Sequence, residues 1–209
     1  LESLRLNNER NVDIEFSGDF SERILNLDII GNIIDLSKNK VEINKKKTNY
    51  YLTQENYKIK TKEVIFAGNV KAENFIAGID KRGNLLSVTS RANSNSHTLD
   101  YTREKNEEYD INIIKSSDIT YFVNSEHVAR KLLSDGELKM TSIRDLSDLK
   151  ANVKIDLQDF VLINTPASLK LLSLPSISGL VSVAEGERGI RFGYGELNYI
   201  ETKDQFSEI

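Results

Sequence analysis

Two glycines in the last quarter of the chain are placed where a phosphate-binding loop is sometimes found. Gly193 and Gly195 follow an alternating apolar segment, as the glycines of a nucleotide loop do. No third glycine completes that motif, and the chain from Glu196 onward continues as a strand pattern where the motif requires a helix. Gly186 and Gly189 have the spacing of a hairpin turn. We therefore expect no phosphate-binding loop in this region.

Two pairs of aspartates are close enough in sequence to suggest acid–base catalysis. Asp156 and Asp159 form one pair, and Asp145 and Asp148 form the other. Paired carboxylates act in hydrolysis only when they converge in a cleft that separates their pKa values. Here one pair lies on the polar phase of a strand pattern and the other in a polar loop. The pattern favours solvated surface over an active site.

The other residue types that perform chemistry are sparse. His97 and His127 have neither a second histidine nor a carboxylate at the spacing of a metal site. The chain contains no cysteine, which excludes disulfides, thiolate nucleophiles and thiolate metal ligands. The serines between residues 173 and 182 lack the glycine-flanked turn of a serine hydrolase. The sequence predicts a protein that is not an enzyme and has no metal or cofactor.

Composition and charge narrow the functional classes to which the protein could belong. The 209 residues are 39% hydrophobic and 29% charged, which is typical of a globular protein, and the net charge is −4. A nucleic-acid partner is not expected, because such proteins usually show a basic balance or a basic stripe. No apolar run approaches the ~18 residues that span a bilayer. The chain begins at Leu1 without a signal peptide, and we expect it to be a piece of a longer protein.

The clearest secondary-structure pattern lies between residues 153 and 199. Residues 153–157 alternate apolar and polar side chains, which predicts a strand with one buried face, and residues 160–164 predict a second strand. Thr165 and Pro166 suit the start of a short helix over 167–174, which Pro175 ends. Alternation returns with Ile190, Phe192 and Tyr194, followed by Leu197 and Tyr199.

Short strands are also predicted through the rest of the chain. They cover residues 12–16, 24–36, 41–43, 50–52, 57–59, 64–66, 75–76, 85–88, 111–113, 119–123 and 138–140. Residues 24–36 contain two apolar phases, which predicts a bulge or turn at Gly31 and Asn32. Other turns are expected at Gly18, at 80–84 and at 145–148, with loops at 93–97 and 103–108. Residues 125–133 predict a second helix.

These elements predict a mainly β fold. We expect a curled antiparallel sheet with an open groove, or a sandwich-like β domain, with two short helices. The region 93–108 is the best candidate for a domain boundary. The leucines of the 167–174 helix nearly surround it, so it needs cover on most sides. It either plugs the end of the β structure or lines a hydrophobic groove.

Residues 159–192 carry a resemblance to a known family. The matching positions are Phe160, Leu162, Pro166, Leu171, Leu172, Ser173, Leu174, Ser176, Gly179, Leu180, Gly186, Gly189, Ile190 and Phe192. This segment resembles the C-terminal region of the AsmA-like superfamily, and the large YhdP-type proteins are the most similar subgroup. Residues 125–140 are similar to the helix and strand that precede it in the family.

The resemblance covers residues 125–197, about a third of the chain, and divides the chain in two. Residues 125–209 are similar to the AsmA-like C-terminal region, truncated at its C-terminal end. Residues 1–124 share only the rhythm of strands, which a repeat of the β groove would explain. Pro175 stands where the family more often has a small residue, and Glu187 with Arg188 adds a charged pair to a turn.

The resemblance also implies a function. Such proteins have an inner-membrane anchor and a long periplasmic β body in Gram-negative bacteria, and they are thought to carry phospholipid toward the outer membrane. Phospholipid acyl chains and envelope or outer-membrane assembly proteins are the implied partners. Anchoring is expected only through parts absent from this chain. The alternative is a structural or interaction module that supports outer-membrane assembly without carrying lipid.

The apolar phase of the best strands and of the corner between them supplies the candidate lipid-contacting residues. They are Ile155, Leu157, Phe160, Leu162, Leu172, Ile177, Leu180, Ile190, Phe192 and Tyr194. An open groove over these residues would favour lipid transport, whereas a closed interior would favour the structural module.

Overall fold

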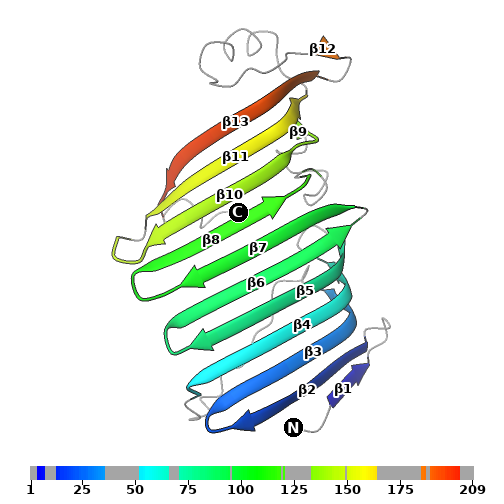
Figure 1. Cartoon of the computed structure of the whole chain (residues 1–209), viewed down its shortest axis with the longest axis vertical. Coiled ribbons are helices and arrows are strands. Elements are labelled where there is room, and N and C mark those ends of the chain that lie inside the picture. The colour runs from blue at the N-terminus through cyan, green and yellow to red at the C-terminus, as the bar shows by residue number, and fades with distance from the viewer. Residues whose placement is uncertain are drawn as a thin grey trace. The chain divides into compact units, whose positions relative to one another are not determined.

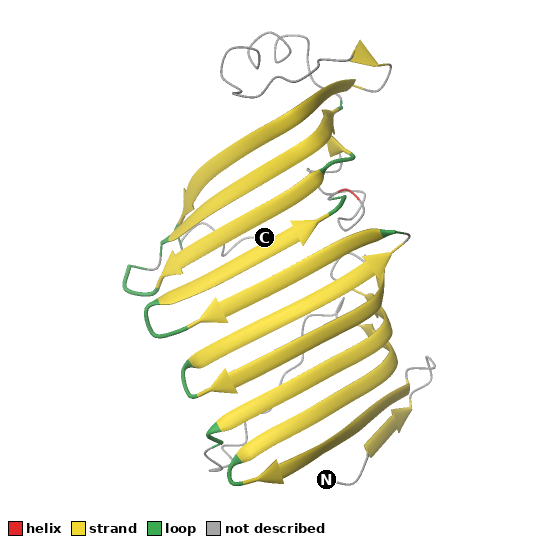
Figure 2. Ribbon diagram, viewed as in Figure 1, coloured by secondary structure: helices red, strands yellow, loops and turns green. Residues whose placement is uncertain are grey.

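The computed structural model of the chain describes residues 4–7, 13–35, 52–65, 71–94, 96–118, 120, 133–148, 150–163, 185–186 and 189–202. Strands dominate these residues (Figures 1 and 2), so the prediction of a mainly β fold is confirmed. Two compact units are present. Unit 1 comprises Leu1–Ser96 and Asp100–Tyr109, and unit 2 comprises His97–Leu99 and Asp110–Ile209.

Unit 1 is a sheet whose strands follow one another in the order of the sequence. Its strands are β1 (Leu4–Asn7), β2 (Asp13–Ser21), β3 (Ile24–Asp35), β4 (Gln54–Ile65), β5 (Lys71–Arg82) and β6 (Leu85–Ser94), with most of β7 (His97–Lys105). β3 and β4 run parallel, whereas an antiparallel sheet was expected. Thr53 anchors the start of β4 beside that of β3, because its backbone N–H donates to the Arg23 carbonyl at 2.9 Å.

Unit 2 is built around one long strand pair. Its strands are β8 (Tyr109–Ser116), β9 (Leu133–Ser134), β10 (Glu137–Asp145), β11 (Ala151–Leu162), β12 (Glu185–Gly186) and β13 (Gly189–Glu201). The spatial order is β8-β10-β11-β13-β12, and β9 also pairs with β11. Antiparallel pairing of β11 with β13 runs from Ala151 opposite Glu201 to Leu162 opposite Ile190.

The strands are longer than their apolar patterns predicted. Residues 153–157 and 160–162 form the single strand β11, and residues 57–59 and 64–65 both lie in β4. The turn expected at Gly18 is wrong, because β2 continues to Ser21. The chain reverses at Glu22 and Arg23, which have φ angles of 48° and 67°. Two consecutive positive φ angles are typical of the type I′ hairpin turn.

Other predicted connections had mixed outcomes. The turn at 80–84 is confirmed at Gly83 and Asn84, and the polar loop at 145–148 is confirmed. The loop expected at 103–108 begins later, since β7 continues to Lys105. The helix predicted over 167–174 lies outside the described residues. The helix predicted over 125–133 also lies outside them, except for Leu133, which belongs to β9. The two units divide between residues 97 and 110, upstream of the boundary at 124 that the resemblance implies.

In unit 1, a row of three residues marks the place where the buried side chains switch from odd-numbered to even-numbered positions. Asn32, Lys62 and Asn74 lie side by side on β3, β4 and β5, and the register of backbone pairs skips them. Asn74 has a left-handed φ of 51°. The buried residues are odd-numbered on one side of the row and even-numbered on the other: Thr61 and Ala77, then Val64 and Ala72. The change of phase predicted at Gly31 and Asn32 falls on this row, with β3 unbroken.

Candidate functional site

The register of β10, β11 and β13 gathers apolar side chains on one side of the unit 2 sheet. Side chains alternate between the faces of a strand, so residues paired across neighbouring strands share a face. One row joins Met140, Ile155 and Leu197, and the next joins Ser142, Val153 and Tyr199. We use the term apolar face for the surface formed by Met140, Val153, Ile155, Leu157, Leu197 and Tyr199.

An aromatic cluster closes one end of the apolar face. Phe160, Ile190 and Phe192 are 4%, 8% and 2% exposed, and the two phenylalanine rings stack with centroids 5.3 Å apart. Leu133, Leu157 and Leu162 pack against these three residues. The cluster therefore brings together most of the apolar residues that the sequence singled out.

Asp159 explains how two apolar phases of β11 reach the same face. Leu157 and Phe160 are three positions apart and would point to opposite faces of a regular strand. Asp159 has a left-handed φ of 49°, and the register with β13 skips it. Leu157 packs against the Phe160 cluster, and a Cβ on its partner Gly195 would lie 2.9 Å from the Phe160 ring. The alternation is thus inverted at Asp159.

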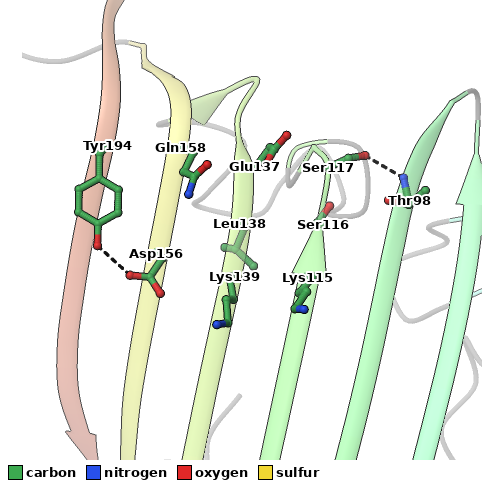
Figure 3. A pocket seen from close by; sticks show the side chains of 10 residues that line it. All are labelled: Thr98, Lys115, Ser116, Ser117, Glu137, Leu138, Lys139, Asp156, Gln158 and Tyr194. Atoms are coloured by element: carbon green, nitrogen blue, oxygen red, sulfur yellow. Dashed lines mark hydrogen bonds between the residues drawn. The ribbon is translucent and has the colours of Figure 1, made fainter. Parts of the chain in front are cut away.

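The same inversion places Tyr194 on the opposite, polar face. The sequence predicted that Ile190, Phe192 and Tyr194 share one face, and this is wrong for Tyr194. Its hydroxyl group lies 2.9 Å from Asp156 Oδ1, a contact drawn in Figure 3, and 2.7 Å from Glu196 Oε2. Gly193 precedes Tyr194 and is skipped by the register opposite Asp159. The inversion therefore affects β13 as well as β11.

Tyr194 belongs to a charged network on the polar face. Asp156 and Glu196 are directly opposite in the register, and like charges in this position repel. Lys154 Nζ relieves the repulsion, since it lies 3.2 Å from Asp156 Oδ1 and 3.0 Å from Glu196 Oε2. Asn198 Nδ2 donates to Glu196 Oε1 at 2.7 Å. Each carboxylate therefore has at least two polar partners.

These contacts hold Glu196 ionised and Tyr194 protonated around neutral pH. The hydrogen bond from Tyr194, aided by those from Asn198 and Lys154, lowers the pKa of Glu196 to about 2. The hydrogen bonds that Tyr194 makes to Glu196 and Asp156 raise the pKa of Tyr194 to about 12. A general acid or base works best with a pKa near the operating pH. Neither group meets that condition, so the network acts as a link between β11 and β13.

A hollow of about 590 Å³ lies beside this network within unit 2. Its lining residues, drawn in Figure 3, are Thr98, Lys115, Ser116, Ser117, Glu137, Leu138, Lys139, Asp156, Gln158 and Tyr194. Among the described residues, no group of three or more histidine, cysteine or acidic side chains could hold a metal ion. The hollow offers hydrogen-bonding and charged groups.

Asp145 and Asp148, one of the two aspartate pairs considered for catalysis, have structural partners. Asp145 Oδ1 accepts hydrogen bonds from the Ser147 backbone N–H at 2.8 Å and from its hydroxyl at 2.6 Å, which lower the Asp145 pKa. Asp148 Oδ1 accepts from the Lys150 backbone N–H at 2.9 Å. Such local bonds are typical of turns. The interpretation of these residues as a polar turn is confirmed.

The structure places most of the predicted lipid-contacting residues, but not all. Leu172, Ile177 and Leu180 lie outside the described residues. The strand register adds Met140, Leu197 and Tyr199 to the apolar face. Alternation in the sequence had marked all three as apolar strand positions. Only the pairing of β10, β11 and β13 shows that they share a face with Ile155 and Leu157.

Three comparisons with known proteins were negative. No protein-family model, no curated protein and no solved structure matches the chain. The resemblance to AsmA-like proteins therefore stays a prediction. In the part of the chain that the structure describes, no helix is long and apolar enough to cross a membrane.

Proposed function

We propose that the chain is a non-enzymatic segment of a bacterial envelope protein whose apolar face binds phospholipid acyl chains. Following the sequence resemblance, the segment belongs to the periplasmic body of an inner-membrane-anchored protein in a Gram-negative bacterium. It carries phospholipid between the inner and outer membranes. The observation that supports this proposal is the exposure of apolar side chains at the β13 end of the apolar face. Leu197 is 56% exposed and Tyr199 is 42% exposed.

The chemistry of acyl chains suits such a surface. Burial of apolar area is worth about 25 cal/mol per Å² and has no directional requirement. An acyl chain can therefore slide along neighbouring apolar rows while it keeps similar contact. Met140, Ile155 and Leu197 form such a row across three strands, and Tyr199 extends the surface along β13. No catalytic group is needed for this movement.

Burial divides the candidate lipid-contacting residues into two roles. Ile155 and Leu157 are partly exposed on the apolar face, where an acyl chain can touch them. Phe160, Ile190 and Phe192 are buried in the aromatic cluster and hold the end of the sheet together. We assign the cluster the role of an end wall. Tyr194 contacts the polar face and is removed from the lipid-contacting set.

The burial of this cluster also favours the second candidate function. If the apolar face is covered as completely as Phe192 is, the unit is a closed structural or interaction module that supports outer-membrane assembly. Its role would then be to dock a protein partner of the envelope. Phospholipid retention separates the two functions, because only an accessible apolar face retains acyl chains.

A pair of substitutions on β13 tests the accessible face. Leu197 and Ile200 are 56% and 62% exposed, and their register partners Ile155 and Asn152 lie on opposite faces of β11. Leu197→Asp places a charge on the apolar face, and Ile200→Asp places the same charge on the polar face. Native mass spectrometry with lipid extraction measures the phospholipid that each purified chain retains. We expect the wild type and Ile200→Asp to retain phospholipid and Leu197→Asp to lose it.

Circular dichroism is the control for folding. Exposed positions tolerate a charge, so both variants are expected to keep their strand signal. A wild-type chain without phospholipid, or equal retention in all three chains, would contradict lipid binding by the apolar face. A bare wild type would support the structural module.

A further inference from the structure

Unit 1 contains a hollow of about 460 Å³ that the proposed function does not use. Its lining residues are Glu15, Ile30, Gly31, Asn32, Lys60, Thr61, Lys62, Asn74 and Ile76. Small-molecule sites commonly enclose about 300 to 1,000 Å³ and combine apolar walls with a few polar groups. The hollow has both the size and the mixed lining of such a site.

Two isoleucines and a lysine stem form the apolar part of this hollow. Ile30 on β3 pairs with Lys60 on β4, which pairs with Ile76 on β5. Neighbouring strands lie about 4.8 Å apart, so the three side chains form one continuous row across the sheet. Ile30 is 52% exposed and Ile76 is 54% exposed. The methylene stem of Lys60 can cover apolar surface while its ammonium group stays in water.

The charged part of the hollow carries a net positive charge. Lys60 and Lys62 are exposed, and among the described residues neither forms an ion pair. Other lysines of unit 1 do form such pairs: Lys71 lies 3.4 Å from Glu63, and Lys81 lies 2.5 Å from Glu55. Glu15 supplies the one carboxylate of the lining. Two ammonium groups and one carboxylate leave a charge of about +1 at neutral pH, which matches a monoanion.

The parity change in unit 1 explains why a hollow forms at this place. Asn32, Lys62 and Asn74 lie in the row that the register skips, and all three line the hollow. Gly31 has no side chain to fill it. The Thr61 hydroxyl is turned to the backbone, where it donates to the Glu63 carbonyl at 2.9 Å. The amide groups of Asn32 and Asn74 remain as neutral donors beside the two lysines.

We infer that this hollow binds the carboxylate end of a single-chain fatty acid. Lys60 and Lys62 hold the carboxylate, and Ile30 and Ile76 cover the adjacent methylene groups. Ammonium–carboxylate hydrogen bonds are stronger than neutral ones, which gives the site selectivity for an anionic head group. The inference depends on residues of unit 1 alone. It stands whether or not the apolar face of unit 2 binds phospholipid.

Three ligands built on a ten-carbon chain test the charge preference on the full wild-type protein. Decanoate, 1-decanol and decyltrimethylammonium share an apolar tail and differ in the charge of the head group. Isothermal titration calorimetry at concentrations below micelle formation measures each affinity. We expect decanoate to bind roughly tenfold more tightly than 1-decanol, as a charge-assisted hydrogen bond predicts, and the cation to bind least. Equal affinity for decanoate and 1-decanol would overturn the inference.

Lysine substitutions locate the site. The double variant Lys60→Met with Lys62→Met keeps unbranched side chains of similar length and removes both charges. We expect it to bind decanoate roughly tenfold more weakly and 1-decanol unchanged. Lys58→Met is the matched control, because Lys58 is an exposed lysine of the same strand that does not line the hollow. The inference fails if Lys58→Met weakens decanoate binding as much as the double variant does.

A unit 2 variant separates this inference from the proposed function. Leu197→Asp is expected to lose phospholipid and to keep its affinity for decanoate. Loss of decanoate binding in Leu197→Asp would place the fatty acid on the apolar face and would contradict a site in unit 1. Retention of decanoate by a wild-type chain that carries no phospholipid would support the unit 1 site alone.

Discussion

The two units invert the alternation of their strands in similar ways but with different results. In unit 1 the row of Asn32, Lys62 and Asn74 borders a hollow with exposed isoleucines. In unit 2 the positions of Asp159 and Gly193 border a stack of two buried phenylalanines. Each row contains a residue with a left-handed φ, near 50°, in an otherwise extended strand. A similar inversion at a left-handed residue thus borders a cavity in unit 1, whereas side chains fill the corresponding space in unit 2.

The difference comes from the residues next to each row. Phe160 and Phe192 are directly paired and fill the space beside Asp159. In unit 1 the residue after Asn74 is also a phenylalanine, Phe75, but its partner across the strands is Thr61. The hollow beside the row is lined by Gly31, Thr61 and Lys60. Where the alternation of side chains along a strand inverts, side-chain packing is interrupted. Only large apolar side chains can fill the resulting gap. The comparison predicts that unit 2 is sensitive to substitutions beside its row and that unit 1 tolerates them.

The largest expected effect is that of Phe160→Ala. Removing a buried phenylalanine side chain leaves a cavity and lowers the free energy of unfolding by about 3 to 5 kcal/mol. Ile76→Ala beside the unit 1 row is the control, and it should change that free energy by less than about 0.5 kcal/mol because Ile76 is exposed. Hydrogen exchange of the β11 and β13 amides, compared with that of β4 and β5, measures each unit separately. Similar losses in both units would contradict the comparison.

Gly195→Ala should have the next largest effect. A Cβ on Gly195 would lie 2.9 Å from the Phe160 ring, so the stack must shift, at a cost of about 1 to 3 kcal/mol in unfolding free energy. Gly78→Ala on β5 is the matched control, because its Cβ would lie 3.4 Å from the Thr89 hydroxyl. That variant should be neutral or stabilise by up to ~1 kcal/mol, since alanine restricts the unfolded chain. Chemical denaturation measures both.

The sequence predicted the strand content because alternation depends only on the order of residues. It could not predict strand lengths, since polar residues such as Gln158 and Asp159 continue β11 through the gap between two apolar runs. Two features required the register between strands. One is the parallel pairing of β3 with β4, and the other is the transfer of Tyr194 to the polar face. Residues far apart in sequence decide both.

Substitutions at the left-handed residues test whether both rows depend on the same left-handed backbone conformation. Asp159 and Asn74 have φ angles of 49° and 51°, where a β-branched side chain is strained. Asp159→Val and Asn74→Val should each lower the free energy of unfolding by about 1 to 2 kcal/mol. Asp159→Gly and Asn74→Gly should remain within about 0.5 kcal/mol of the wild type, because glycine adopts this φ freely. A loss confined to one unit would show that the rows differ in backbone as well as in side chains.

The smallest expected effects concern two clusters of tyrosine, glutamate and lysine, one in each unit. In unit 2 the hydrogen bond from Tyr194 is the main cause that lowers the pKa of Glu196 to about 2. In unit 1 the main cause that lowers the pKa of Glu55 is its hydrogen bond with Lys81, and Tyr57 comes second. Tyr194→Phe should therefore raise the glutamate pKa more than Tyr57→Phe does. Carbon-13 NMR of the glutamate carboxyl groups measures both, and equal rises would contradict this ranking.

The same shifts fix the pH dependence of stability. Glu196 has a folded pKa below its ordinary value of 4.5, so its contribution is complete above pH 4.5 and is lost as the pH falls toward 2. Tyr194 and Tyr57 have folded pKa values of about 12 against an ordinary 10.0, so their contributions are complete below pH 10 and are lost as the pH rises toward 12. Tyr194→Phe should weaken both the acid dependence that Glu196 contributes and the alkaline dependence. Tyr57→Phe should reduce chiefly the alkaline part, because Lys81 still holds Glu55 ionised. Denaturation across pH 2 to 12 separates the two clusters by this asymmetry.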